Sequence, residues 1–503
     1  MSSSTKAVSN TIFLTLDWIS ISLLSFIYSF VIWKTLDPWD YGIITTSVNI
    51  MMMLGNISMF GMGIAAQKLI AEYNEKKQGG KIGSLIRFSL ILIFIFDIFI
   101  CAVLLLNSNF FASVLKIDES VIWFICAGTF IFSVFYITSS ILLGFQDMKG
   151  FFKTNLVGNI LKLVISTTLI LLGLRYFGPL AGVVIGFAVV PLIRFKRNWF
   201  GSSKDFERKK VVIDYCLPAF VAGLASTVFS NVHYIILTVI KNPEVTGLFS
   251  LAMTVATLVA LVPGIISQAI FPITSQLSAR KNSKGRQVKL VGTAFRYSLL
   301  IAIPFAIMLV IMLKPLILFI KLKMEYLPAV QYMPILATGS LLLGCGGIFS
   351  SSIYAIGKTR VNRNIFVLSA IVFLLFSIPM TYFFSAYGLA FSFLLVAALQ
   401  FTLSYFFITK YTSLKLPLAN IGKILLSSLI FMLVLYFSEK YFESFILKVS
   451  VTAVSFAVYA VALLLMKSFN GQDILLIRHI AENSPKPVKD AAELACRIME
   501  KFM

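Results

Sequence analysis

The chain is organised in long blocks of apolar residues separated by short polar segments. Blocks of about 20 residues, the length that crosses a bilayer as an α-helix, recur from one end of the chain to the other. This pattern predicts an all-α polytopic membrane protein with about fourteen transmembrane helices. The candidate spans are 11–33, 41–66, 88–106, 121–145, 154–175, 178–194, 215–240, 247–272, 295–320, 331–356, 364–385, 388–409, 421–438 and 443–466.

Composition and charge agree with this pattern. The 503 residues are 59% hydrophobic and only 13% charged, whereas soluble proteins carry about 25% charged residues. Of the 43 Lys and Arg, 33 fall in the segments that share a side with the N-terminus, nine fall on the other side, and Lys162 lies within a span. The positive-inside rule therefore places both termini in the cytoplasm and the chain in the cell membrane. The net charge of +22 reflects topology, so we expect no nucleic-acid partner.

An internal repeat organises the spans. The first part of the repeat contains an outer turn, a Gly that opens a helix (Gly42 and Gly247) and a basic inner loop. The matching segments are 35–95 with 240–302, 141–152 with 353–364, and 175–186 with 385–396. The offset of about 205–213 residues corresponds to six spans, and an even number of spans returns the chain to the same side. We therefore predict two parallel six-helix lobes, an arrangement typical of one class of secondary transporters.

The repeat sets the expected domain boundaries. Residues 1–200 form the N-lobe, 201–410 the C-lobe and 411–466 an extra helix pair, with the basic stretch 194–210 as the linker between lobes. Residues 467–503 form a cytoplasmic tail whose end has the spacing of an amphipathic helix. That helix is predicted to lie either on the membrane surface or against an inner loop.

The fifth span carries a polar stripe around a charged residue. Asn155, Asn159, Lys162 and Ser166 recur at i, i+4, i+7 and i+11, which is one face of a helix. A charged side chain at bilayer depth costs about 2.5–3.5 kcal/mol. Lys162 lies roughly 12 Å into its span, near the middle of a hydrocarbon core of about 30 Å, so reaching an interface is difficult. We favour a polar cavity around Lys162 over pairing with another span, and both over snorkelling.

Two further spans contribute ionisable groups. His233 follows Ser226 and Ser230 on one face of the seventh span, and it is either functional or a hydrogen-bonded core residue. Asp17 lies in the first span, where an acid can bind a proton or sodium ion or pair with a cation such as Lys162. The first and seventh spans are equivalent under the repeat, so both residues are candidates to face the gap between lobes.

The sequence contains no motif that is typical of an enzyme active site. We find no nucleotide-binding loop, no Ser/His/Asp cluster and no metal-ligand spacing. The five cysteines form no CxxC pair and there are two histidines, so we expect no metal site or disulfide framework. The outer loops are too short for a catalytic domain. We therefore expect no cofactor and no enzymatic activity.

The sequence resembles a known family of exporters. The segments "DPWDYGIITTSVNI", "FGMGIAAQKLIAEY", "ILLGFQDMKG" and "RYFGPLAGVVIG", together with the two six-span lobes and the extra helix pair, are similar to the polysaccharide transporter branch of the MOP exporter superfamily. This branch comprises the Wzx-type oligosaccharide flippases. The resemblance covers essentially residues 10–466.

The resemblance implies a pair of lobes around a central cavity that alternates in access. It implies that the cargo is a polyprenyl-(pyro)phosphate-linked oligosaccharide, moved from the inner to the outer leaflet for surface polysaccharide or glycan synthesis. Lys162 would then receive the headgroup, with Lys149, Lys153 and Arg87 at the inner mouth as helpers. Asn159, Asn155 and His233 are the further candidate substrate-binding residues. Asp17 would be the candidate site for a coupling Na⁺ or H⁺. Membrane lipids and glycan-assembly membrane proteins are the other expected partners.

Three alternatives stay open. A lipid II flippase of the MurJ type would also carry an anionic cargo and also has fourteen spans. A MATE-type drug exporter coupled to cations would suit Asp17, but Lys162 would repel a cationic drug. A scaffold for glycan assembly that transports nothing would not need the stripe around Lys162.

Overall fold

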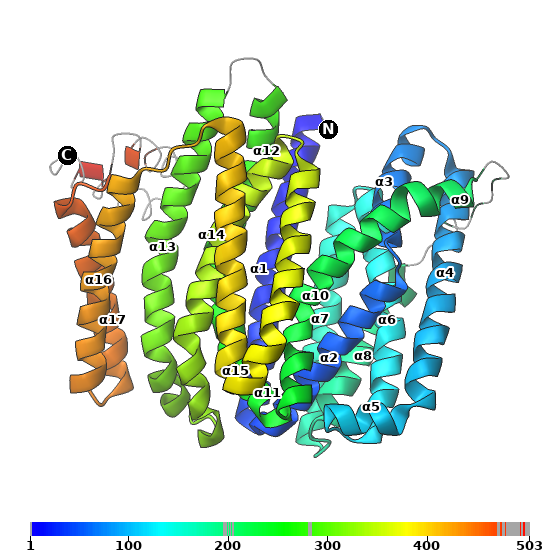
Figure 1. Ribbon diagram of the computed structural model, residues 1–503, viewed down its shortest axis with the longest axis horizontal. Coiled ribbons are helices and arrows are strands. Elements are labelled where there is room, and N and C mark those ends of the chain that lie inside the picture. Colours follow the sequence, from blue (N-terminus) through cyan, green and yellow to red (C-terminus); the bar gives the residue numbers. More distant parts are fainter. Residues whose placement is uncertain are drawn as a thin grey trace. The chain divides into compact units, whose positions relative to one another are not determined.

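The computed structural model describes residues 3–194, 199, 201, 203, 206–279, 284–469, 473–474, 478, 493 and 496–497. Every regular element in this part of the chain is a helix, and no strand occurs in it (Figure 1). The predicted all-α class is therefore confirmed. The predicted helix at the end of the tail falls mostly outside the described residues.

The helices follow one another with short connections. The longer ones are α1 (Ser3–Thr35), α2 (Pro38–Ser58), α3 (Met62–Glu75), α4 (Gly79–Leu106), α5 (Ser108–Leu115), α6 (Glu119–Gly144), α7 (Met148–Leu171), α8 (Phe177–Arg194), α10 (Leu217–Ile240), α11 (Pro243–Thr257), α12 (Leu261–Ala279), α13 (Lys284–Phe319), α14 (Met333–Ala355), α15 (Thr359–Thr412), α16 (Leu418–Tyr441) and α17 (Phe445–Leu465). Short helical pieces, α9 (Arg208–Lys210), a π-helix (Val211–Cys216) and 3₁₀ segments (Leu258–Ala260 and Met324–Tyr332), connect some of them.

The number of membrane crossings agrees with the sequence prediction. Within the described residues, 12 helices are long and apolar enough to span a bilayer, and the pair α2 and α3, bent by 52°, makes a thirteenth. As one straight helix, the 54 residues of α15 would extend over about 80 Å, which is far more than one crossing needs. A non-helical residue, Ser385 (φ 57°, ψ −139°), divides α15 into two helices. With α15 counted as two spans, the described chain has the fourteen crossings expected.

The sequence pattern did not reveal two interruptions. The span expected at 41–66 is broken between Ser58 and Met62, where Gly61 has φ 73°. The span expected at 247–272 contains the 3₁₀ segment Leu258–Ala260 between α11 and α12. Both breaks lie inside continuous apolar blocks, so hydrophobicity alone gives no sign of them.

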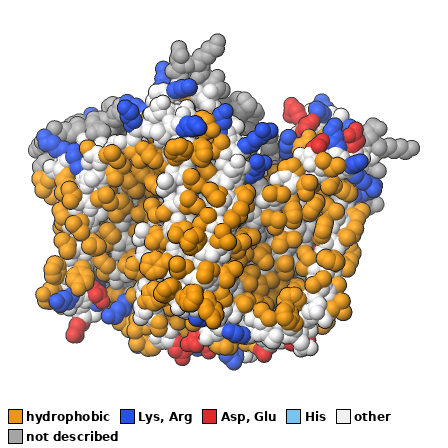
Figure 2. Space-filling view, in the orientation of Figure 1, with side chains coloured by type: hydrophobic (Ala, Val, Ile, Leu, Met, Phe, Trp, Pro, Cys, Tyr) orange, Lys and Arg blue, Asp and Glu red, His pale blue; other side chains and the backbone are white. Residues whose placement is uncertain are grey.

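Charged side chains avoid the middle of the visible face. In Figure 2 hydrophobic side chains cover most of the visible face, and Lys and Arg side chains lie toward its margins. Side chains such as Phe99, Leu375 and Phe383 are more than half exposed, as expected for positions that face lipid. The chain is therefore a multi-pass membrane protein.

Packing divides the chain into two compact units. The first contains Met1–Thr254, Lys321–Leu336 and Thr359–Gln400. The second contains Val255–Ile320, Ala337–Lys358 and Phe401–Met503. The division into lobes at residue 200 was inferred from the repeat, and it stays a prediction.

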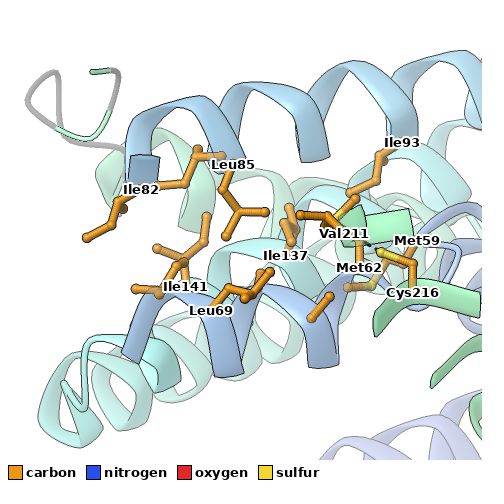
Figure 3. Packing of buried hydrophobic residues seen from close by; sticks show 14 of the residues in the cluster. Met59, Met62, Leu69, Ile82, Leu85, Ile93, Ile137, Ile141, Val211 and Cys216 are labelled. Carbon is orange, nitrogen blue, oxygen red and sulfur yellow. Dashed lines mark hydrogen bonds between the residues drawn. The ribbon is translucent and has the colours of Figure 1, made fainter. Parts of the chain in front are cut away.

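The first unit has a compact apolar core at one end. Residues of α3, α4 and α6, among them Leu69, Leu85 and Ile137, are fully or nearly fully buried together with Val211 and Cys216. Figure 3 shows these side chains meeting between the three helices. The segment that leads into α10 is thereby fixed against the N-terminal helices.

A ridge of glycines brings α8 very close to α7. Gly178, Gly182 and Gly186 follow one another at four-residue intervals along one face of α8. A Cβ atom at Gly186 would lie 2.6 Å from the backbone nitrogen of Lys162, and one at Gly182 would lie 2.1 Å from the Ser166 hydroxyl oxygen. Small residues at such intervals allow membrane helices to pack backbone to backbone. The backbone behind Lys162 is therefore held by α8.

We predict that this contact tolerates no added methyl group. Gly186→Ala should lower the free energy of unfolding by about 1–3 kcal/mol, because the two helices must separate. Gly347→Ala is the matched control, since a Cβ there meets nothing within 4 Å and should stabilise α14 by up to about 1 kcal/mol. The apparent Tm of the purified protein in detergent measures both effects. Equal Tm values for Gly186→Ala and the wild type would contradict this account of α8.

Candidate functional site

The predicted polar stripe meets an acid on the neighbouring helix. In the first unit α1 and α7 lie side by side, and the Nδ2 group of Asn155 donates to both carboxylate oxygens of Asp17, at 2.9 and 3.1 Å. Asn159 donates to the backbone oxygen of Asn155 at 2.9 Å. All three side chains are buried, with 4–6% exposed surface. These polar groups satisfy one another where lipid cannot.

Lys162 lies two turns further along α7 from Asn155. Its ammonium group sits over the ring of Tyr28, 4.5 Å from the centroid, a contact worth about 0.5–2 kcal/mol. No acidic side chain of the described chain lies within ion-pair distance of Lys162. The partner of Asp17 is therefore Asn155 and not Lys162, which settles one of the alternatives left by the sequence.

The fourth member of the stripe lies between two helices. Ser166 is 1% exposed and packs against Gly182 of α8. Its side chain also lies close to that of Tyr28 on α1, the residue whose ring Lys162 contacts. All four members of the stripe are therefore on the part of α7 that packs against α1 and α8.

His233 occupies a separate, aromatic environment. Its ring on α10 is 3.9 Å from Tyr234, 6.1 Å from Phe249 and 6.5 Å from Phe373, measured between centroids. The side chain is 4% exposed, and neither ring nitrogen makes a hydrogen bond within the described chain. The structure does not bring His233 into the group formed by Asp17 and the α7 stripe. Its functional role stays a prediction.

Arg87 and Lys149 are exposed near the ends of their helices. Lys149 is the second residue of α7 and Arg87 the ninth of α4. Along α7, Lys149 and Lys162 are separated by thirteen residues, or about 20 Å. Lys149 therefore does not form one cluster with Lys162, and the functional roles of Arg87 and Lys149 stay predictions.

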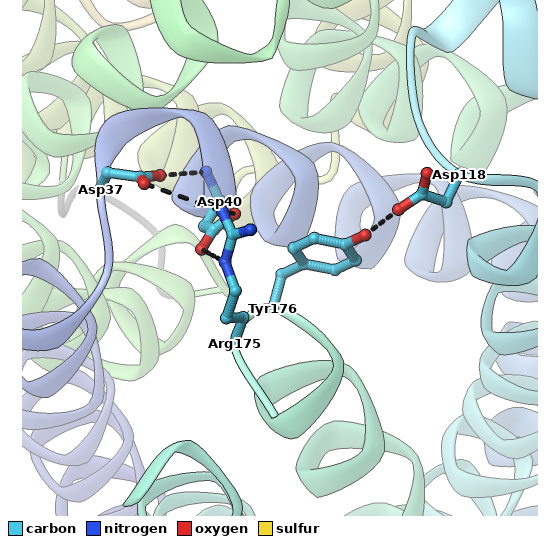
Figure 4. Close-up of polar contacts among 5 residues, drawn as sticks. All are labelled: Asp37, Asp40, Asp118, Arg175 and Tyr176. Atoms are coloured by element: carbon cyan, nitrogen blue, oxygen red, sulfur yellow. Dashed lines mark hydrogen bonds and ion pairs between the residues drawn. The ribbon is translucent and has the colours of Figure 1, made fainter. Parts of the chain in front are cut away.

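A second charged group, which the sequence analysis did not select, lies at the other end of the first unit (Figure 4). The guanidinium group of Arg175, in the turn between α7 and α8, donates to Asp40 from Nε at 3.0 Å and from Nη2 at 2.8 Å. The neighbouring carboxylate raises the pKa of Arg175. Asp37 caps α2 by accepting from the Asp40 backbone at 2.9 Å, and Tyr176 donates to Asp118. This group joins the quoted motifs "DPWDYG" and "RYFG".

The repeat lacks this ion pair in its second copy. The positions that match Asp40 and Arg175 are Val245 and Ser385. Both positions nevertheless have a positive φ, 34° at Arg175 and 57° at Ser385. Comparing the two copies position by position, which needs only the sequence, reveals that both charges are lost together.

The starts of α2 and α11 contact each other reciprocally. A Cβ atom at Gly42 would lie 1.7 Å from the backbone oxygen of Pro243, and one at Gly247 would lie 1.9 Å from that of Pro38. Equivalent residues contact each other's helix, as expected for two copies related by a pseudo-two-fold axis. A hydrogen bond of 2.6 Å between the hydroxyls of Thr46 and Thr238 extends the contact to α10.

Solved structures of membrane transporters share this fold. The lipid II flippase MurJ, in an inward closed conformation, has a TM-score of 0.73 at 16% identity, over 90% of this chain and 97% of that one. An inward-facing MATE family transporter of the MOP superfamily has a TM-score of 0.63 at 14% identity, over 80% and 94%. A MOP transporter from Pyrococcus furiosus, described by a binding pocket of reverse polarity, has a TM-score of 0.55 at 15% identity, over 80% and 95%. The fold is that of MOP superfamily transporters.

The family follows from the sequence. The pattern of the polysaccharide biosynthesis protein family matches residues 7–278, so the chain belongs to that family, and the resemblance stated above is confirmed. A Shigella dysenteriae protein named as an O-antigen transporter is 25% identical over 219 residues. That match covers 42% of this chain and 52% of the relative. The chain thus spans about half the length of the curated relative it matches.

We predict that Asp40 depends on Arg175 for its charge compensation. The Asp40 side chain is 2% exposed, so Arg175→Ala should cost about 1–3 kcal/mol by removing both charged donors. Because Arg175 is itself 63% exposed, water partly replaces it and the lower half of this range is expected.

A double-mutant cycle in detergent tests this coupling. Asp40→Asn should restore part of the Tm lost in Arg175→Ala, because an amide needs no counter-charge. Purely additive Tm changes would show that the two side chains do not stabilise each other.

Proposed function

We propose that the protein is a flippase that moves polyprenyl-(pyro)phosphate-linked oligosaccharide from the inner to the outer leaflet, for surface polysaccharide or glycan biosynthesis. Membership of the polysaccharide biosynthesis family supports the substrate class, as does the relative named as an O-antigen transporter. The observation that carries the proposal is Lys162, a cation in mid-span whose contact is an aromatic ring rather than an acid.

The mechanism uses the cation to replace water around an anionic headgroup. An ammonium ion on a flexible stem is an effective point charge for a phosphate. Lys162 binds the phosphate, and the amides of Asn155 and Asn159 offer hydrogen bonds to the headgroup. Arg87 and Lys149 attract the headgroup at the entrance, and His233 on α10 is a further contact for it. The polyprenyl tail stays in the bilayer while the headgroup crosses along the polar face.

Asp17 is proposed as the coupling site. Its carboxylate accepts two hydrogen bonds from a single amide, so it retains oxygen lone pairs for a Na⁺ ion or a proton. Binding there changes the charge beside Asn155, which lies two turns before Lys162 on α7. The gradient of that ion can then reset the transporter after the cargo leaves.

The membrane orientation is also proposed. The excess of Lys and Arg places both termini in the cytoplasm of a cell with this protein in its cytoplasmic membrane. The reciprocal contact of α2 and α11 then lies at the outer end of these helices, where it closes the transporter to the outside. Alternating access requires that contact to open, as in other repeat-based transporters.

The first prediction concerns Lys162. Lys162→Ala should abolish transfer of a fluorescent polyprenyl-pyrophosphate oligosaccharide across proteoliposome membranes, and Lys162→Arg should keep part of it. Lys440→Ala is the matched control, because Lys440 also lies near a tyrosine ring, 5.8 Å from Tyr441, but at the end of α16. Transport by a folded Lys162→Ala at the wild-type rate would make Lys162 structural.

The second prediction concerns Asp17. Asp17→Asn removes the titratable group but keeps its volume, so transport should lose its dependence on an imposed Na⁺ or H⁺ gradient and fall at least tenfold. Counterflow of labelled cargo without a gradient should remain, which separates lost coupling from misfolding. A gradient dependence equal to that of the wild type would assign coupling to another residue.

The third prediction concerns the outer contact. Thr46 and Thr238 touch through their hydroxyls at 2.6 Å, so the double variant Thr46→Cys, Thr238→Cys should form a disulfide under oxidation. Transport should stop on oxidation and return on reduction, while each single variant stays active. Full transport by the oxidised double variant would mean that α2 and α10 need not separate.

A drug exporter is the second candidate, because Asp17 provides an intramembrane acid of the kind that binds cations and because a MATE transporter shares the fold. The transport assay in proteoliposomes distinguishes a drug exporter from an oligosaccharide flippase. Export of cationic dyes on a sodium or proton gradient, with no movement of lipid-linked oligosaccharide, would favour this candidate. Movement of lipid II in preference to other cargo would favour a function like that of MurJ.

A further inference from the structure

A basic pocket lies in the second unit and is formed by other elements than those of the polar stripe. It has a volume of about 240 Å³ and is formed by the first turns of α13, the segment before α16, and Asp473. Its charged and polar lining residues are Lys289, Thr293, Arg296, Lys415, Asn420 and Asp473. Three cations face one carboxylate, so the pocket has an excess of positive charge.

Arg296 is built into the wall of this pocket. It is 5% exposed, donates to the backbone oxygen of Ser468 at 3.3 Å, and forms an ion pair with Asp473, which is 2% exposed. Tyr297 also donates to the Asp473 carboxylate. The acid is thus fixed by two donors, whereas Lys289 and Lys415 are exposed at the rim. The bound carboxylate demonstrates that this wall accommodates an anionic oxygen group.

The backbone adds to the positive potential. The 24-residue helix α16 begins at Leu418, and Pro417 before it supplies no side-chain cap. The first N–H groups of a helix carry partial positive charge and favour anions. Lys423 of α16 donates to the backbone oxygen of Lys467 at 2.8 Å, and this hydrogen bond holds the segment after α17 in place.

Position and size restrict the ligand. The pocket lies where α13 and α16 start, at the boundary between basic connections and apolar spans. Its volume is slightly below the range of about 300–1,000 Å³ for small-molecule sites, so it fits a headgroup phosphate and not an oligosaccharide. Basic pockets between transmembrane helices at this depth recognise anionic headgroups.

We propose that this pocket binds the phosphate of an anionic membrane lipid, with Lys289 and Lys415 as the contacting cations. The Asp473 carboxylate is an anion of the chain itself, and it competes with the lipid phosphate for the cations of the pocket. The pocket thereby ties the segment after α17 to the lipid composition of the leaflet. The proposal does not depend on the identity of the transported cargo.

Native mass spectrometry of the detergent-purified full chain tests the site. Adducts are counted during titration with phosphatidylglycerol, and with phosphatidylcholine as the lipid without net charge. The double variant Lys289→Gln, Lys415→Gln should bind phosphatidylglycerol about tenfold more weakly and phosphatidylcholine unchanged. Asp473→Asn should bind phosphatidylglycerol several-fold more tightly, because its competing charge is gone.

The matched control is the double variant Lys440→Gln, Lys448→Gln. These two lysines belong to the same unit, one in the last turn of α16 and one in the first turns of α17, and their loss should leave binding unchanged. An equal loss in this control would overturn the site in favour of unspecific attraction. Unchanged or weaker binding by a folded Asp473→Asn would overturn the role of Asp473.

A third titration with inorganic phosphate distinguishes the source of the phosphate group. Millimolar phosphate should displace little lipid, since it lacks the bilayer anchor. Displacement of phosphatidylglycerol at micromolar phosphate, with a rise in Tm that the Lys289→Gln, Lys415→Gln variant lacks, would overturn the lipid proposal and identify a site for the free ion.

Discussion

The hydrocarbon core of the membrane offers no water to a polar group, and this constraint explains how the first unit is built. Each intramembrane polar side chain must find its partner on its own or a neighbouring helix. Asp17 finds Asn155 across α1 and α7, and Asp97 on α4 accepts a hydrogen bond of 2.6 Å from Ser133 on α6. Within the described part of the chain, Lys162 has an aromatic neighbour and no acid within ion-pair distance. The buried acids of this unit are thus satisfied by neutral donors, and the proposal of an anionic cargo rests on this difference between Lys162 and the acids.

The two copies of the repeat keep the same framework but differ in chemistry. Gly42 and Gly247 preserve the close crossing of α2 and α11, because a side chain on either would collide with the other helix. The ion pair of Asp40 and Arg175 occurs in one copy, with Val245 and Ser385 at the matching positions of the other. The backbone contact that admits no Cβ is thus shared by the two copies, whereas this ion pair belongs to one of them.

Much of the fold was predictable because long apolar blocks and the distribution of Lys and Arg are set by the bilayer itself. The stripe on α7 was also predictable, since helical periodicity places Asn155 and Lys162 on one face. The partner of Asp17 was not, because spacing within one helix gives no information on which neighbour it meets. The break between α2 and α3 was missed for a similar reason: Gly61 is pressed against the backbone of Cys216, a contact made by residues distant in the sequence. The ion pair of Arg175 could have been suspected from the two copies of the repeat.

The glycine ridge of α8 has a mechanical consequence. Because the backbones of α7 and α8 touch over several turns, the two helices move as one stiff hairpin. Lys162 lies within this hairpin and Arg175 at its tip, about 20 Å apart along the chain. At the tip, Arg175 is bonded to Asp40 at the start of α2. A single close-packed hairpin therefore joins the residue in the middle of its span to the helix that also contacts α11.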